Sequence, residues 1–212
     1  MNFKKFVERV KDLPVIETES LLIGEAVPGK TAVQISRWQK AGRLLQLKRG
    51  IYVLSETYRK IDPPEYYLAG LLNKPAYVSL EKALEYHGLI PEAVPVYSCV
   101  TTKRPGRMVT PLGVFDYRHV RSSLFWGYRS VKINGLAVFV ATPEKALLDL
   151  FYLRPVKVTE DYLDGMRLQN VEAINVKELI ACARRFRKPK ITAAAEAVKA
   201  YIRKYRRGAK TL

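Results

Sequence analysis

The sequence predicts an α+β protein built from two parts, and three observations carry this prediction. Apolar residues recur at helical spacing over 3–12 and again through the last third of the chain. Between these regions, short alternating apolar runs are separated by Pro and Gly, which is typical of strands. The stretch 55–65 contains Asp62-Pro63-Pro64 and predicts a linker. We therefore expect one part over residues 1–60 and a second over residues 61–212.

The first part predicts three helices. They are expected over 3–12, 18–26 and 30–41, from the spacing of their apolar residues. The tripeptide Val27-Pro28-Gly29 predicts a turn before the third helix. Gly42 follows that helix and suits its C-terminal cap.

A β-hairpin is expected directly after the third helix. The segment RLLQLKRGIYVL, residues 43–54, alternates around Gly50 and predicts two strands with Lys48, Arg49 and Gly50 at the tip. Three helices followed by such a hairpin are typical of a winged helix-turn-helix, a DNA-binding domain.

The third helix has two chemically different sides. At 100° per residue, Thr31, Ile35 and Trp38 fall on one side and are expected to face the core. Residues 27–53 contain six basic residues and no acidic one, so the helix and hairpin form a uniformly positive region. The side opposite the core carries Val33, Ser36, Arg37 and Lys40.

Individual roles follow from side-chain chemistry. Arg37 matches guanine and Gln34 matches adenine bidentately, so these two residues are the candidates for reading base edges. Ser36 could contact either a base or a phosphate. The remaining cations are expected to bind phosphate, which positions the helix without reading sequence: Lys30, Lys40, Arg43, Lys48 and Arg49. A solvated helix face and a protein-interaction module remain as alternatives.

The net charge of +17 is unevenly distributed. Residues 1–60 hold twelve basic and six acidic residues, residues 61–183 hold fourteen and thirteen, and residues 184–212 hold eleven and one. A positive field at both ends attracts a polyanion, which can be nucleic acid, an anionic membrane or an acidic protein.

The C-terminal cations are expected to form a second basic surface, for nucleic acid or for an acidic partner. The alternative is a solvated helix face above an apolar stripe that contains Val198, Tyr201, Ile202 and Tyr205. Membrane adsorption fits the charge, but this apolar face is weak, and no membrane partner is expected. The residues of the basic surface are Arg184, Arg185, Arg187, Lys188, Lys199, Arg203, Arg206 and Arg207.

The second part predicts a small antiparallel sheet surrounded by helices. Asn134-Gly135 between two apolar runs is a hairpin signal. Ser79, Thr142 and Asn175 are each placed to cap a helix. Strands are expected over 95–102, 112–120, 129–133 and 136–141. Helices are expected over 65–72, 79–87, 143–153, 159–169, 175–187 and 191–206.

Three segments resemble AbiEi-type antitoxins, the regulator half of type IV abortive-infection toxin–antitoxin pairs. The wing LKRGIYVL at 47–54 resembles the family's basic–Gly–aromatic wing. AYVSLEKALEYHGLIPEAVP at 76–95 resembles the start of its second domain, and VATPEKALLDLFYLRP at 140–155 resembles its most recognisable motif.

This resemblance implies a repressor that binds operator DNA, usually inverted repeats, and represses its own operon. It also implies a second domain needed for antitoxin action. The implied functional partner is a nucleotidyltransferase-like toxin, which need not form a stable complex with the antitoxin. An antitoxin that binds its toxin directly remains an alternative.

No catalytic site is expected, and we expect neither a bound metal nor a cofactor. Lys145 and Asp149 are expected to form an i,i+4 pair on a helix. The rival reading is a nuclease delivered to DNA by the winged domain. Its nearest signal is Asp116-Tyr117-Arg118, in which arginine cannot serve as a base.

Two further expectations concern the location of the protein. Cys99 and Cys182 lie in apolar surroundings and predict buried thiols in a reducing cytosol. The first ten residues, MNFKKFVERV, lack the apolar stretch of a secretory signal. A cytoplasmic protein is therefore expected.

Overall fold

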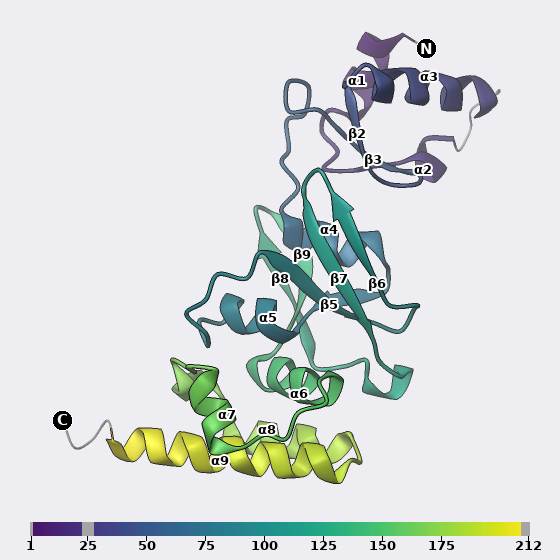
Figure 1. The fold of residues 1–212 in the computed structure, drawn as a ribbon. Helices are drawn as coiled ribbons and strands as arrows, with labels where there is room; N and C mark the ends of the chain where they lie inside the picture. The colour runs from purple at the N-terminus through teal and green to yellow at the C-terminus, as the bar shows by residue number, and fades with distance from the viewer. Residues whose placement is uncertain (1, 23–27, 209–212) are drawn as a thin grey trace.

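A computed structural model describes residues 2–22 and 28–208 and has an α+β fold (Figure 1). The helices are α1 (Phe3–Val10), α2 (Thr18–Leu22), α3 (Pro28–Lys40), α4 (Glu65–Leu72), α5 (Leu80–Tyr86), α6 (Pro143–Leu153), α7 (Glu160–Gly165), α8 (Val176–Arg185) and α9 (Pro189–Gly208), with short 3-10 turns η1 (Ser122–Leu124) and η2 (Val171–Ala173). The strands are β1 (Ile16–Glu17), β2 (Leu44–Lys48), β3 (Ile51–Leu54), β4 (Ala76–Val78), β5 (Val96–Thr101), β6 (Gly106–Thr110), β7 (Gly113–His119), β8 (Tyr128–Ile133) and β9 (Leu136–Ala141).

The N-terminal unit combines α1, α2 and α3 with a three-stranded antiparallel sheet in the order β1-β3-β2. The predicted hairpin is confirmed, and β1 is an additional strand that the sequence analysis did not predict. The hydroxyl of Thr18 donates to the carbonyl of Gly50 at the hairpin tip, over 3.2 Å. Gly50 has φ +81°, which explains why a glycine occupies this turn. The apolar cluster of this unit consists of Phe6, Val10, Ile16, Ile35, Trp38, Leu44 and Leu54.

Helix α3 begins earlier than predicted. Pro28 and Gly29 belong to its first turn, so the prediction of a turn at these two residues was wrong, while Val27 lies outside the described residues. A proline suits the start of a helix because it has no N–H to leave unsatisfied. The end of α3 is as predicted, since Gly42 has φ +68° and its N–H and that of Arg43 donate back to the carbonyls of Gln39 and Trp38.

The second unit is built on a six-stranded sheet in the order β6-β7-β5-β4-β9-β8. The antiparallel pairings β6/β7, β4/β5 and β8/β9 agree with the predicted antiparallel sheet. The pairings β5/β7 and β4/β9 are parallel and were not predicted. Strands β4 and β6 were not predicted either, because they are short and have no clear alternation.

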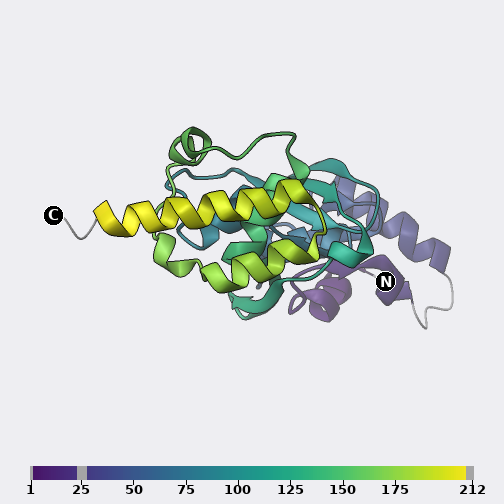
Figure 2. The ribbon, with the colours of Figure 1, turned by 90° about the horizontal axis from the view of Figure 1, so that it is seen from below.

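The C-terminal helices cover the end of the sheet unit that lies away from α3 (Figures 1 and 2). Helix α6 packs against α5, α8 and α9, and α8 and α9 run side by side. Helix α9 buries Ile191, Ala194, Val198 and Ile202, whereas Tyr205 is 46% exposed. The alternative of a solvated face above an apolar stripe was therefore wrong to include Tyr205, because this end of α9 projects past the rest of the protein (Figure 2).

Two of the three predicted N-terminal helix caps are confirmed. Thr142 accepts from the N–H of Lys145, and Asn175 accepts from the N–H groups of Lys177 and Glu178. Ser79 occupies the cap position of α5, but its side chain makes no capping bond. Its hydroxyl donates instead to the buried carboxylate of Asp149, which is the stronger acceptor.

The Asn175 cap provides a first testable prediction. We expect Asn175→Ala to lower the free energy of unfolding by about 1 kcal/mol, because two N–H groups at the start of α8 lose their acceptor. Urea unfolding followed by circular dichroism measures this change. Asn175→Ser is the matched control and should retain most of the stability; equal losses in both variants would show that the cap is not the cause.

Candidate nucleic-acid interface

The outer side of α3 is exposed and lies at one end of the molecule (Figure 1). Thr31, Ile35 and Trp38 are buried, as predicted. The exposed side carries Ser36, Arg37 and Lys40, together with Val33, whose side chain is 52% exposed. Gln34 is half-buried on the flank of this surface. The helical spacing therefore identified both sides of α3 correctly.

Aromatic packing fixes α3 in its position. The ring of Trp38 packs on that of Phe6 at 4.6 Å and on that of Phe3 at 5.4 Å, both from α1. The amide of Gln39 donates to the side-chain oxygen of Gln46 on β2 over 3.0 Å. These contacts hold the exposed side of α3 in one orientation, as a reading surface requires.

The predicted cations around α3 differ in their surroundings. Within the part of the chain that the structure describes, Arg37, Lys40 and Arg49 make no ion pair. The guanidinium of Arg43 lies over the ring of Phe3, 4.8 Å from its centre. The side chain of Lys30 lies outside the described residues.

Lys48 is placed differently from the other predicted phosphate ligands. Its amine donates to the backbone carbonyl of Leu72, at the end of α4, over 2.9 Å. A second contact between the two units joins Lys74 and Glu17 over 3.2 Å. The amine of Lys48 thus helps to attach the hairpin to the second unit, and this contact competes with its predicted role at a phosphate.

Apolar contacts reinforce this attachment. Val15, Leu47 and Val53 of the N-terminal unit are buried in the apolar cluster of the second unit. One side of the hairpin is therefore covered by the second unit, while Arg49 at its tip and the outer side of α3 stay exposed.

The C-terminal basic residues lie at the other end of the molecule. Arg184, Arg185, Arg187, Lys188, Lys199, Arg203 and Arg206 are all exposed on α8, on α9 or on the turn between them. The side chain of Arg207 lies outside the described residues. Because α9 and α3 occupy opposite ends of the molecule (Figure 1), the structure does not bring the two predicted basic surfaces together.

The second unit contains a buried polar cluster around Lys145 and Asp149. The predicted i,i+4 ion pair is present, and both side chains have no exposed surface. The amine of Lys145 also donates to the hydroxyl of Tyr77, over 2.9 Å. Asp149 accepts from the hydroxyls of Tyr77 and Ser79, at 2.9 and 2.8 Å. Sequence reasoning missed Tyr77 and Ser79, which lie about seventy residues away along the chain.

Burial acts on both members of this pair. It lowers the pKa of Lys145 and raises the pKa of Asp149, while the mutual attraction of the two charges opposes both shifts. The stem of Lys145 packs against Gly127, which has φ +77°, and a side chain at that position would overlap it. Lys145 and Asp149 are closed to solvent and pack as part of the core.

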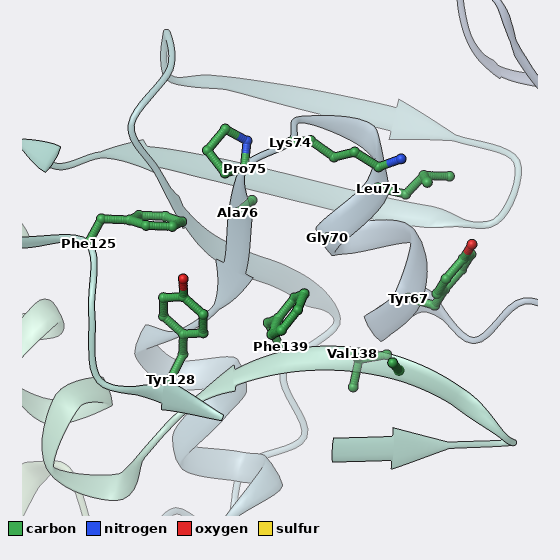
Figure 3. A pocket seen from close by; sticks show the side chains of 11 residues that line it. Tyr67, Gly70, Leu71, Lys74, Pro75, Ala76, Phe125, Tyr128, Val138 and Phe139 are labelled. Atoms are coloured by element: carbon green, nitrogen blue, oxygen red, sulfur yellow. The ribbon is translucent and has the colours of Figure 1, made fainter. Parts of the chain in front are cut away.

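An apolar cavity of about 380 Å³ lies beside this cluster (Figure 3). The rings of Phe125, Tyr128 and Phe139 line part of it, and Tyr128 also stacks on Tyr77 at 4.7 Å. Lys74 is the charged residue of its lining. Since these lining residues include no acid, the cavity lacks the paired acid and base of a hydrolytic site.

The nuclease alternative depends on carboxylates near Asp116. Its carboxylate instead accepts from Nε of Arg118, over 2.9 Å. In residues 2–22 and 28–208, no three His, Cys, Asp or Glu side chains are grouped so as to hold a metal ion.

The two cysteines are buried, as predicted. Burial raises the pKa of both thiols, that of Cys182 to about 11, so neither is a reactive thiolate at neutral pH. Among the helices that the structure describes, none is both long enough and apolar enough to cross a bilayer.

Comparisons with known proteins do not assign this chain to a family. No protein-family model matches it, and no curated protein matches it.

Proposed function

We propose that this protein is a sequence-specific DNA-binding repressor whose residues 1–60 form a winged helix-turn-helix. The observation that supports it most is the outer side of α3, where Ser36, Arg37 and Lys40 are exposed and no other part of the described chain covers them. The order of helices and the antiparallel hairpin after α3 also suit this fold.

In this proposal α3 enters the major groove. Arg37 donates to guanine, Gln34 pairs with adenine, and Ser36 contacts a base or a phosphate. Val33 is a new candidate, because an exposed aliphatic side chain between polar neighbours can contact the methyl group of thymine. Lys40, Arg43 and Arg49 bind phosphates on either side of the groove.

We further propose that the chain is an antitoxin of the AbiEi type that represses its own operon in the cytoplasm. The three segments at 47–54, 76–95 and 140–155 support this part of the proposal by their resemblance to that family. Its operator would be an inverted repeat read by two winged units. Its functional partner would be a nucleotidyltransferase-like toxin that forms no stable complex with it.

A gel-shift experiment tests the DNA-binding proposal. The full chain is titrated against the DNA upstream of its own gene and against a shuffled duplex of equal length and composition, in 150 mM salt. We expect binding to the upstream DNA at least a hundredfold tighter than to the shuffled duplex. Equal affinity for both duplexes would overturn the proposal of a sequence-specific repressor.

The salt dependence of binding tests the phosphate contacts. We expect Lys40→Gln and Arg49→Gln each to reduce the slope of log K against log salt by about 0.9, because each loses one phosphate contact. Lys48→Gln is the matched control from the same hairpin, and it should change the slope less because the Lys48 amine bonds to Leu72. If Lys48→Gln reduced the slope as much as Arg49→Gln does, Lys48 would also bind phosphate, and its assignment to the contact with Leu72 would be contradicted.

A further inference from the structure

A basic pocket lies between η1 and the turn that joins α8 to α9. Its volume is about 550 Å³, which is within the range of small-molecule sites. Three separate segments form it: η1 and the residue before it, the end of α6, and the α8–α9 turn. Its polar lining consists of Arg121, Ser123, Tyr152, Arg185, Arg187 and Lys188.

Four cations converge on this pocket, and its lining contains no carboxylate. Within the described residues, none of the four forms an ion pair. Several other lysines of α9 do have partners: Lys199 pairs with Glu196, Lys204 with Glu160, and the amine of Lys190 donates to the Arg154 carbonyl. The pocket therefore holds four positive charges and no carboxylate, which favours an anion.

Aromatic contacts fix the wall of the pocket. The guanidinium of Arg185 lies over the ring of Trp126, 3.7 Å from its centre. Phe186 is buried, and its ring contacts those of Tyr152 at 5.4 Å and Trp126 at 5.6 Å. The backbone that carries Arg185, Arg187 and Lys188 is thus anchored at Arg185 and Phe186. A ligand would therefore meet cations whose backbone is already in place, which lowers the entropic cost of binding.

The position of the pocket separates it from the proposed operator site. The turn between α8 and α9 lies at the end of the molecule opposite α3 (Figures 1 and 2). A duplex bound to the outer side of α3 would contact the end of the molecule opposite the pocket. The pocket therefore lies apart from the surface proposed to contact the operator.

We propose that this pocket binds a small anion with two or three linked phosphoryl groups, such as the oligophosphate of a nucleotide. Arginine forks match phosphoryl oxygens bidentately, and two or more arginines around one concavity suit linked phosphates better than a single ion. The hydroxyls of Ser123 and Tyr152 supply neutral donors beside them. This inference does not depend on the proposed repressor function.

Calorimetric titration of the full chain with inorganic tripolyphosphate tests the pocket, in 150 mM salt. We expect one tripolyphosphate per chain and at least a tenfold loss of affinity in Arg121→Gln/Lys188→Gln. The matched control is Arg203→Gln/Arg206→Gln, which removes two exposed charges from the other end of α9 and should change affinity less than twofold. Substitutions are used because α9 contributes to the core, so truncation would unfold the unit.

Three results would overturn the proposal. The first is that the unchanged chain does not bind tripolyphosphate. The second is that both double variants lose the same affinity for tripolyphosphate. The third is that single-stranded RNA binds through Arg121 and Lys188 and tripolyphosphate does not compete with it. The last result would assign the pocket to a nucleic-acid backbone instead. Thermal unfolding of both double variants confirms that they fold, so that a loss of affinity reports on the pocket.

Discussion

Replacing Lys145 with methionine is expected to lower the free energy of unfolding by about 3–5 kcal/mol, the largest single effect on stability that we predict. The amine of Lys145 contacts Asp149, and both side chains are fully buried. Methionine fills most of the same space but leaves the carboxylate without a positive partner. Urea unfolding at pH 8 measures the loss.

The pH dependence of the Lys145→Met variant tests the cause. Without the lysine, Asp149 keeps its raised pKa, because burial is the main cause of that shift. The folded state then binds a proton at Asp149 more readily than the unfolded state does. The contribution of Asp149 to stability is therefore most favourable at low pH and becomes less favourable as the pH rises through the folded-state pKa. The deficit relative to the unchanged chain should therefore be smaller at pH 5 than at pH 8.

Two further variants separate charge from packing. Lys132→Met, at an exposed position on β8, should change stability by less than about 0.5 kcal/mol. The double variant Lys145→Met/Asp149→Asn removes both charges. The amide oxygen of the new asparagine can still accept a hydrogen bond from Tyr77 or Ser79. We therefore expect the double variant to be more stable than Lys145→Met alone. A Lys145→Met variant as stable as Lys132→Met would show that the buried pair does not stabilise the fold.

Local features of this chain were predictable from its sequence because their causes lie within a few residues. Asn134 and Gly135 both have positive φ, +49° and +78°, as the tight turn between β8 and β9 requires. The caps at Thr142 and Asn175 depend on N–H groups two or three positions away. The two sides of α3 follow from the helical repeat alone.

Other features depend on partners that are distant in the sequence. Strand β4 has only three residues, all of them buried, so it shows no alternation; it is recognised by its pairing with β5 and β9. The hydroxyl of Ser79 leaves its own helix end because Asp149, seventy residues later, is a better acceptor. No local sequence pattern predicts the pairing of β4 or the bond between Ser79 and Asp149. The same holds for the contact of Arg121 with the pocket at the α8–α9 turn.

The same distinction applies to the proposed DNA site. Spacing and charge predicted which side of α3 is exposed, but they could not show that the second unit occupies one side of the hairpin and the amine of Lys48. The sequence therefore predicted the same role for Lys48 and Arg49. In the structure the two differ: the amine of Lys48 bonds to Leu72, whereas the side chain of Arg49 has no partner among the described residues.

Replacing Arg37 with alanine is expected to have the largest effect on DNA recognition. Arg37 is exposed on the outer side of α3, and a guanidinium that donates to both guanine acceptors contributes about 1–3 kcal/mol of discrimination. We expect Arg37→Ala to weaken operator binding about 5- to 150-fold more than it weakens binding to a shuffled duplex. Fluorescence anisotropy with both duplexes at one salt concentration measures this ratio.

Lys40→Ala is the matched control for Arg37, since it removes one positive charge from the same exposed side of the same helix. A phosphate ligand lowers affinity for all sequences alike, so Lys40→Ala should weaken operator and shuffled DNA by similar factors. Arg37→Lys keeps the charge but cannot form the bidentate contact, and it should therefore retain binding to shuffled DNA while losing discrimination. If Arg37→Ala also weakens both duplexes equally, Arg37 binds phosphate, and sequence must be read by other residues of α3.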